Sequence, residues 1–286
     1  MEIYKTRLVV RGNTQREGID FTETFSPVVK MTTIRTIIAL AAHRHWDIFQ
    51  IDVNNAFLHG DLHEEVCMKM PEGIPNPSNK ECQLQKSLYG LKQASRQWFA
   101  KLHSFLLQQG HTQSHSDSSL FLKVSASHIT IVGIYVDDIL ITSSHHDDIV
   151  VLKHHLHSSF GIKDLGLLHC FLDLEVTYLP AGTSLKQQKF TNELLQDTGF
   201  LHAKPAPTPL PLNCKLTHDA GNLLQDPSYY RTIIVKLNFL THIRPDLSYT
   251  LQFLSQFMQP PRASHFLALE HTLRYLAGSS GQGILL

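Results

Sequence analysis

The chain has 286 residues, an apolar content of 42% and a formal net charge of zero, so it can form one large or two modest domains. The net charge of zero excludes a uniformly basic nucleic-acid-binding protein, although it permits local basic surfaces. Scattered histidines, four cysteines without a CxxC pair and short apolar runs exclude an ordinary zinc finger and a membrane-spanning helix, and favour a reduced intracellular protein.

The first third of the chain predicts strands around one helix. Residues 4–11 alternate basic and apolar side chains, as in a strand with one solvated face. Apolar residues recur at helical spacing over 34–43. A strand is predicted over 46–53 and carries Asp52 near its end, and a short helix is predicted over 54–58.

Residues 86–109 contain no acidic side chain, and basic residues are interleaved with aromatic ones along them. Apolar positions from Leu91 to Phe105 recur at helical spacing, so a helix that ends before Gly110 is predicted. We interpret Trp98 and Phe105 as core residues, because aromatic side chains on the apolar face of a helix are usually buried.

The next stretch, residues 129–142, has two β-branched apolar runs separated by Asp137 and Asp138. The runs predict a buried hairpin whose tight turn carries two adjacent carboxylates. A solvated surface turn is one interpretation of this acidic pair. A divalent-metal site is the other, because a cation offsets the cost of holding two carboxylates together.

The last part of the chain is expected to be mainly helical. A strand region is predicted over 168–178, and the prolines of 204–211 indicate a stiff connector. Helices are predicted over 148–160, 187–198, 229–242, 246–258 and 264–277. The pattern as a whole predicts an α+β protein with a helical final third.

Asp52 and the pair Asp137 and Asp138 lie at the ends of strands that can share one sheet. Carboxylates from neighbouring strands can converge on two divalent ions, an arrangement used by polymerases. Magnesium suits such hard oxygen ligands and keeps several waters, so few protein ligands are needed. Manganese is a possible substitute.

Tyr135, Val136, Asp137 and Asp138 resemble the YxDD motif of reverse transcriptases. Further stretches, in the same order, resemble the copia-type LTR-retrotransposon subgroup specifically. They are 5–9 (KTRLV), 23–30 (ETFSPVVK), 50–58 (QIDVNNAFL), 87–94 (SLYGLKQA), 163–166 (KDLG), 244–246 (RPD) and 273–276 (LRYL). The resemblance covers nearly the whole chain and implies an RNA-directed DNA polymerase.

The resemblance also implies roles for individual residues. The catalytic and metal-binding carboxylates would be Asp52, Asp137 and Asp138, with Lys163 protonating the pyrophosphate. Contacts with the deoxynucleoside triphosphate and the template would come from Lys5, Arg7, Phe57, Tyr89, Gly90, Lys92 and Tyr135. Phe57 would exclude a ribose 2′-hydroxyl, with core packing as its alternative role. Phe171 and Leu172 resemble the primer grip.

The implied architecture is a right-hand polymerase. Residues 1–210 would form the fingers, the palm and the start of the thumb, and 211–286 a helical thumb-like or tether region that leads toward an RNase H domain. The implied partners are an RNA or DNA template-primer and deoxynucleoside triphosphates, without a membrane. The domain would normally belong to a polyprotein with integrase and RNase H, in cytoplasmic virus-like particles.

Four positions depart from the pattern of the subgroup: Asn54, Ser95, Asp173 and Val235. Asp173 stands where glycine is usual, so it would be strained if the turn requires a positive φ. These departures, and the incomplete fingers that the resemblance implies, leave an alternative function open. In that alternative the chain is an inactive retrotransposon relic that binds nucleic acid weakly.

Overall fold

The computed structural model describes residues 8–71, 73–75, 78, 80–219 and 221–286. Contacts divide the chain into two compact units, Met1–Leu168 and His169–Leu286. Both contain helices and antiparallel strands, as the α+β prediction requires. Lys5 and Arg7, the predicted triphosphate contacts, lie outside the described residues.

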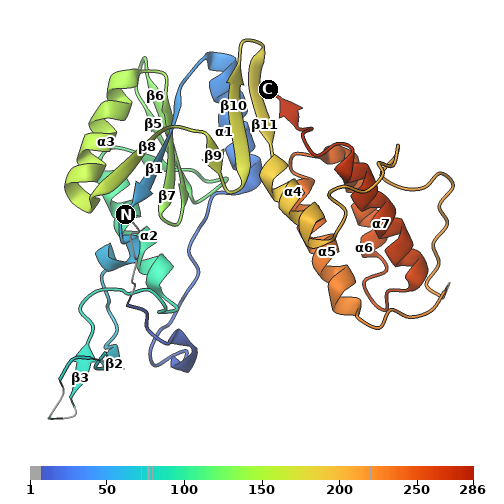
Figure 1. Ribbon diagram of the computed structural model, residues 1–286. Coiled ribbons are helices and arrows are strands. Elements are labelled where there is room, and N and C mark those ends of the chain that lie inside the picture. Colours follow the sequence, from blue (N-terminus) through green and yellow to red (C-terminus); the bar gives the residue numbers. More distant parts are fainter. Residues whose placement is uncertain (1–7, 72, 76–77, 79, 220) are drawn as a thin grey trace. The chain divides into compact units, whose positions relative to one another are not determined.

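The first unit is built on a six-stranded sheet whose described pairings are all antiparallel (Figure 1). β-branched residues favour the two central strands, where they fill the pleated surface on both faces. In spatial order the strands are β4 (Thr112–Gln113), β5 (Leu120–Val124), β6 (Ile129–Tyr135), β7 (Asp138–Ser143), β1 (Ile48–Val53) and β8 (Ile162–Leu167).

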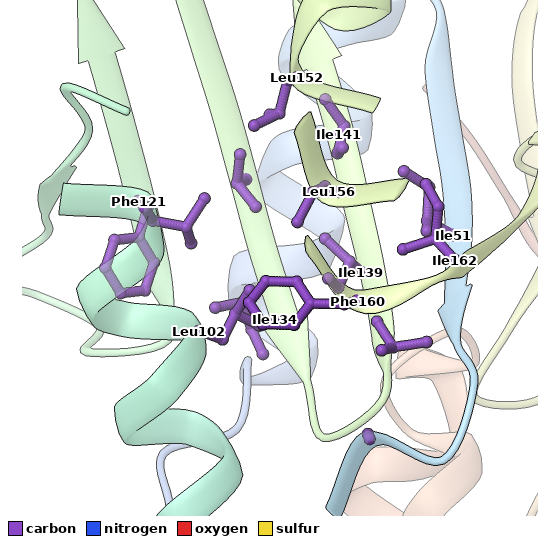
Figure 2. Packing of buried hydrophobic residues seen from close by; sticks show 14 of the residues in the cluster. Ile51, Leu102, Phe121, Ile134, Ile139, Ile141, Leu152, Leu156, Phe160 and Ile162 are labelled. Carbon is purple, nitrogen blue, oxygen red and sulfur yellow. The ribbon is translucent and has the colours of Figure 1, made fainter. Parts of the chain in front are cut away.

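Helices cover the two faces of this sheet. Side chains of α2 (Ala94–Gln108) and α3 (His146–Phe160) form one core with alternate residues of the central strands (Figure 2). Helix α1 (Met31–Arg44) packs on the opposite face, where a Cβ at Gly133 would lie 3.4 Å from the Cδ1 atom of Ile37. Trp98 in α2 is fully buried, which confirms its prediction as a core residue.

Two sequence predictions in this unit are corrected. The described residues 8–11 form no strand, and the backbone N–H of Val10 instead donates to the carbonyl of Tyr89 at 2.8 Å. Helix α2 begins at Ala94 and not near Leu91. The short elements are η1 (Gly12–Thr14), η2 (Ala56–His59), β2 (Cys67–Lys69) and β3 (Glu81–Gln83).

The second unit combines a small sheet with a helical core. Residues 168–178, predicted as one strand region, form a tight hairpin of β9 (Cys170–Phe171) and β10 (Leu174–Leu179). The other elements are β11 (Gly182–Lys186), α4 (Gln188–Asp197), α5 (Pro227–Leu240), η3 (Pro245–Leu247), α6 (Ser248–Ser255), α7 (Ala263–Ala277) and β12 (Ile284–Leu285). Within the described ranges, no helix combines the length and apolar character needed to cross a membrane.

An ion pair within the motif of residues 244–246, with a buried guanidinium, is linked to the motif of residues 273–276. The guanidinium of Arg244 donates to both carboxylate oxygens of Asp246, at 3.0 and 2.7 Å, and to Ser279. The hydroxyl of Tyr275 donates to the same carboxylate at 2.9 Å. Burial raises the pKa of Asp246, but the bonds and charge of Arg244 outweigh it and leave the pKa lowered. These motifs thus stabilise the helical core.

Candidate active site

The acidic pair lies where the turn between β6 and β7 ends: Asp137 is in the turn and Asp138 is the first residue of β7. The strands pair as far as Tyr135 and Asp138, which leaves Val136 and Asp137 as a two-residue turn. This confirms the predicted hairpin. Val136 has a φ of 55°. For a β-branched residue this left-handed conformation is unusual and costs about 1–2 kcal/mol.

Strand register aligns four predicted site residues in one row across the sheet. Asp138 on β7 lies opposite Tyr135 on β6 and opposite Asp52 on β1. Asp52 in turn lies opposite Lys163 on β8. Directly opposed residues of antiparallel strands point to the same face, with Cβ atoms about 4.5–5.5 Å apart. The register therefore brings together residues that are widely separated in the sequence.

Burial and negative neighbours raise the pKa of Asp138. Burial is the largest cause, a hydrogen bond from Gln50 opposes it, and the charges of Asp137 and Asp52 raise the pKa further. None of the three carboxylates forms an ion pair within the described part of the chain. A hard divalent cation binds to several neighbouring carboxylate oxygens whose negative charge no ion pair neutralises. The three residues thus fit the predicted metal site.

Two residues of this site were not identified from the sequence. Gln50 Nε2 donates to Asp138 Oδ1 at 3.2 Å, and the buried Trp98 donates from Nε1 to the carbonyl oxygen of Val136 at 2.7 Å. Gln50 could have been found from its position, because it is two residues before Asp52 and shares its face of the strand. No local pattern could have revealed the contact between Trp98 and the turn.

The predicted nucleotide-contacting segment packs against η2, the short helix that follows β1. The rings of Phe57 and Tyr89 have centroids 4.5 Å apart, and Phe57 is partly buried against the core. Gly90 has a φ of 95°, and a Cβ there would lie 2.0 Å from the carbonyl oxygen of Val10. Only glycine permits this close approach of two backbone segments.

Lys92 and Gln93 bind to the loop of residues 15–21. The backbone N–H of Lys92 donates to Gln15 Oε1 at 2.8 Å, and its ammonium donates to the Gln15 carbonyl at 3.2 Å. That ammonium also lies 4.9 Å from the ring centroid of Phe21. The buried Gln93 bonds to the side chain of Gln15 and to the carbonyl of Asp20, each at 3.0 Å. Lys92 is therefore bound to the loop in this conformation.

The predicted primer-grip residues belong to the second unit. Phe171 is buried there, and Leu172 and Asp173 form the two-residue turn between β9 and β10. Their φ angles are 51° and 61°. Two consecutive positive φ angles are typical of a type I′ hairpin turn, in which glycine and asparagine are preferred. Asp173 was expected to be strained if this turn requires a positive φ, and its φ of 61° meets that condition.

A second group of possible metal ligands was not predicted from the sequence. Ligand atoms of His128, His145 and Asp148 lie within 4.8 Å of one another at the opposite end of the β6–β7 hairpin. However, the two imidazole rings stack at 4.2 Å and 10°, so their in-plane lone pairs do not converge. The adjacent N-terminus of α3 also disfavours a cation.

Comparison with known proteins decides the family. The family model for reverse transcriptase (RNA-dependent DNA polymerase) matches residues 2–211. This chain belongs to the reverse transcriptase family. The family assignment made from the sequence motifs is therefore confirmed, and the carboxylate row occupies the matched region.

Relatives place this reverse transcriptase domain in the copia-type retrotransposon group. It is 46% identical over 288 residues to the retrovirus-related Pol polyprotein from transposon RE2 of Arabidopsis thaliana, with 99% of this chain covered. It is 44% identical over 285 residues to the RE1 polyprotein of the same plant, again with 99% covered. The polyprotein from transposon TNT 1-94 of Nicotiana tabacum is 40% identical over 292 residues, or 97% of this chain. The chain spans 20%, 19% and 22% of the lengths of these three relatives.

Proposed function

We propose that this chain extends a primer on an RNA or DNA template by adding deoxynucleotides. The pairing of Asp52 with Asp138, beside the turn that presents Asp137, carries the proposal. Members of this family act with divalent metal, and we assign two Mg²⁺ ions, or Mn²⁺ as a substitute, to these three carboxylates. Bound ions would lower the pKa of the attacking 3′-hydroxyl and stabilise the charge of the leaving pyrophosphate.

The remaining residues of the row orient the carboxylates and supply a proton. Gln50 holds the Asp138 carboxylate through its 3.2 Å hydrogen bond and so limits its rotation. Lys163, which lies opposite Asp52, is the proposed proton donor to the pyrophosphate. Its position on the same face of the sheet as the acids supports this role.

The aromatic pair of Phe57 and Tyr89 is the proposed element that selects deoxynucleotides over ribonucleotides. Phe57 is fixed by its contacts with the core and with the ring of Tyr89. A rigid ring can exclude a substituent as small as a 2′-hydroxyl, whereas a mobile ring would yield to it. We therefore assign discrimination against ribonucleotides to Phe57 and base packing to Tyr89.

The proposed architecture follows from the site. The six-stranded sheet would be the palm, residues 1–210 would contain the fingers, the palm and the start of the thumb, and 211–286 would be the thumb-like or tether region. The two compact units meet after Leu168, which lies before residue 211, where the proposed thumb-like or tether region begins. Because the relatives are Pol polyproteins, we further propose that the domain acts within such a polyprotein, next to integrase and RNase H, in an intracellular particle.

Primer extension on a primed RNA template, with and without Mg²⁺, tests the proposal. The wild-type chain should extend the primer only with divalent cation. Asp137→Asn should abolish extension, because the amide removes the charge that the proposed metal site needs. Asp147→Asn is the matched control: its side chain is 83% exposed in the first turn of α3, and its removal should leave the rate unchanged.

A second candidate function is nucleic-acid binding without catalysis, favoured by the two positive φ angles at Leu172 and Asp173 in the predicted primer grip. Salt-dependent binding of the primed template without extension, unaltered by Asp137→Asn, would support it. Absence of extension by the folded wild-type chain would contradict the polymerase proposal. Absence of binding would contradict both.

A further inference from the structure

The turn that carries Asp137 has an unfavourable backbone conformation. Val136 has a φ of 55° and is the first residue of the two-residue turn. Glycine is the residue usually found where a turn requires a positive φ, because it has no Cβ. A strained conformation persists only where surrounding contacts hold it. The contacts around Val136 therefore determine how Asp137 is presented.

The indole of Trp98 supplies one such contact from outside the hairpin. Its Nε1 donates to the carbonyl oxygen of Val136 at 2.7 Å, and the side chain is fully buried. The ring of Phe160 packs edge-on against it, with centroids 5.1 Å apart and an interplanar angle of 88°. Because an indole has one N–H donor and a buried donor is costly to leave unbonded, the bond to Val136 fixes the indole and the carbonyl together.

Strand β1 supplies a second contact at the next carbonyl. The backbone N–H of Val53 donates to the carbonyl oxygen of Asp137 at 3.0 Å. The peptide groups on both sides of the Asp137 Cα are thus held, one by α2 and one by β1. With both peptide planes fixed, the direction of the Asp137 Cα–Cβ bond is fixed as well.

We propose that Trp98 is a positioning residue for catalysis: its indole N–H holds Val136 in the left-handed conformation and thereby directs the Asp137 carboxylate toward Asp52. This inference rests on the proposed polymerase function. It also links two parts of the site, because α2 begins directly after the segment of Tyr89 and Lys92. The same helix then holds both the nucleotide-contacting segment and the catalytic turn.

Trp98→Phe tests the proposal, because it keeps an aromatic ring but removes the N–H donor. The kcat of primer extension should fall by about tenfold to a hundredfold, as expected for a misplaced catalytic group, while the KM for deoxynucleotide stays within about twofold. Leu106→Val, a conservative change at a fully buried position of the same helix, is the control for a general loss of packing. It should reduce kcat only in proportion to the unfolded fraction.

A second-site change separates positioning from packing. Val136→Gly in the Trp98→Phe background should recover much of the lost kcat, because glycine adopts a positive φ without strain. The same glycine in the Leu106→Val background should recover nothing. An unchanged kcat in Trp98→Phe, a loss no larger than that of Leu106→Val, or no recovery with Val136→Gly would each overturn the proposal.

Hydrogen exchange of the peptide that contains residues 129–142 provides a readout independent of activity. Trp98→Phe should accelerate exchange in this peptide more than Leu106→Val does at equal global stability. If the wild-type chain does not extend primers, the polymerase function fails, and exchange still decides whether Trp98 holds the turn. If the wild type is active and exchange is unchanged in Trp98→Phe, the positioning role alone fails.

Discussion

Asp52 lies directly opposite Asp138 across the antiparallel pair of β1 and β7, so two like charges face each other on one surface of the sheet. Opposed like charges destabilise a sheet, and burial adds to the cost at Asp138. The pair therefore lowers local stability, and a cation bound at the proposed metal site would offset this cost.

Asp52→Asn should therefore stabilise the metal-free chain by about 0.5–1 kcal/mol, because it removes one of the opposed charges. It should also abolish primer extension. Added Mg²⁺ should raise the melting temperature of the wild type but not that of Asp52→Asn, since only a cation that binds the native state stabilises it. Thermal unfolding with and without Mg²⁺ measures both effects. Asp47→Asn, exposed just before the same strand, should behave like the wild type; a Mg²⁺ response in Asp52→Asn would contradict the site.

Gly90→Ala should destabilise the first unit by about 2 kcal/mol or more, through positive φ and a steric clash together. The added Cβ would lie 2.0 Å from the Val10 carbonyl oxygen. Gly18→Ala isolates the φ contribution, because Gly18 has a φ of 79° but a Cβ added there would meet no atom within 4 Å. Its cost should be nearer about 1 kcal/mol. Denaturant unfolding compares the two, and equal losses would show that the contact with Val10 is unimportant.

Asp173→Gly should stabilise the second unit by about 0.5–1 kcal/mol, because it relieves the positive φ of 61° in the β9–β10 turn. Asp173→Asn separates conformation from charge: asparagine tolerates the left-handed region but carries no charge. If the turn contacts a primer, both variants should bind template-primer more tightly at low salt. Unfolding curves and salt-dependent binding are the measurements. A destabilised Asp173→Gly variant would show that the aspartate makes a contact worth more than the strain.

The buried imidazole of His111 should make stability depend on pH. Burial, followed by the charge of Lys123, lowers the pKa of His111 from 6.5 to about 4. The unfolded chain binds a proton below pH 6.5, whereas the folded chain resists protonation until about pH 4. Stability should therefore fall as pH falls from 6.5 toward 4, by up to about 3 kcal/mol, and the contribution should level off below that.

His111→Leu should remove this component of the pH dependence, while His154→Gln, at an exposed position of α3, should keep it. Urea unfolding at successive pH values gives the comparison. His265 also has a pKa lowered by burial, so a smaller slope of the same sign should remain in His111→Leu. An identical slope in His111→Leu and in the wild type would show that His111 does not titrate as its burial requires.

Local patterns predicted most elements correctly, with errors where tertiary contacts intervene. Residues 148–160, predicted as a helix, lie in α3, and the two apolar runs of 129–142, predicted as a hairpin, form β6 and β7. The alternating residues 8–11 failed as a strand because the backbone of Val10 bonds to a turn at Tyr89 and not to a strand. The burial of Arg244 has no local signal, because it depends on Asp246 and the distant Ser279 accepting its hydrogen bonds.

The sequence by itself determined the family, the two short runs that form the hairpin and the acidic residues at its turn, because these depend on residue type and on spacing along a short stretch. Only the tertiary structure decided that Asp52 faces Asp138, that Lys163 faces Asp52 and that Trp98 reaches the Val136 carbonyl. Register between distant strands depends on how the whole core packs, since a slip of one residue would reverse the face of every side chain. The carboxylates are specified locally, and their convergence is a property of the fold.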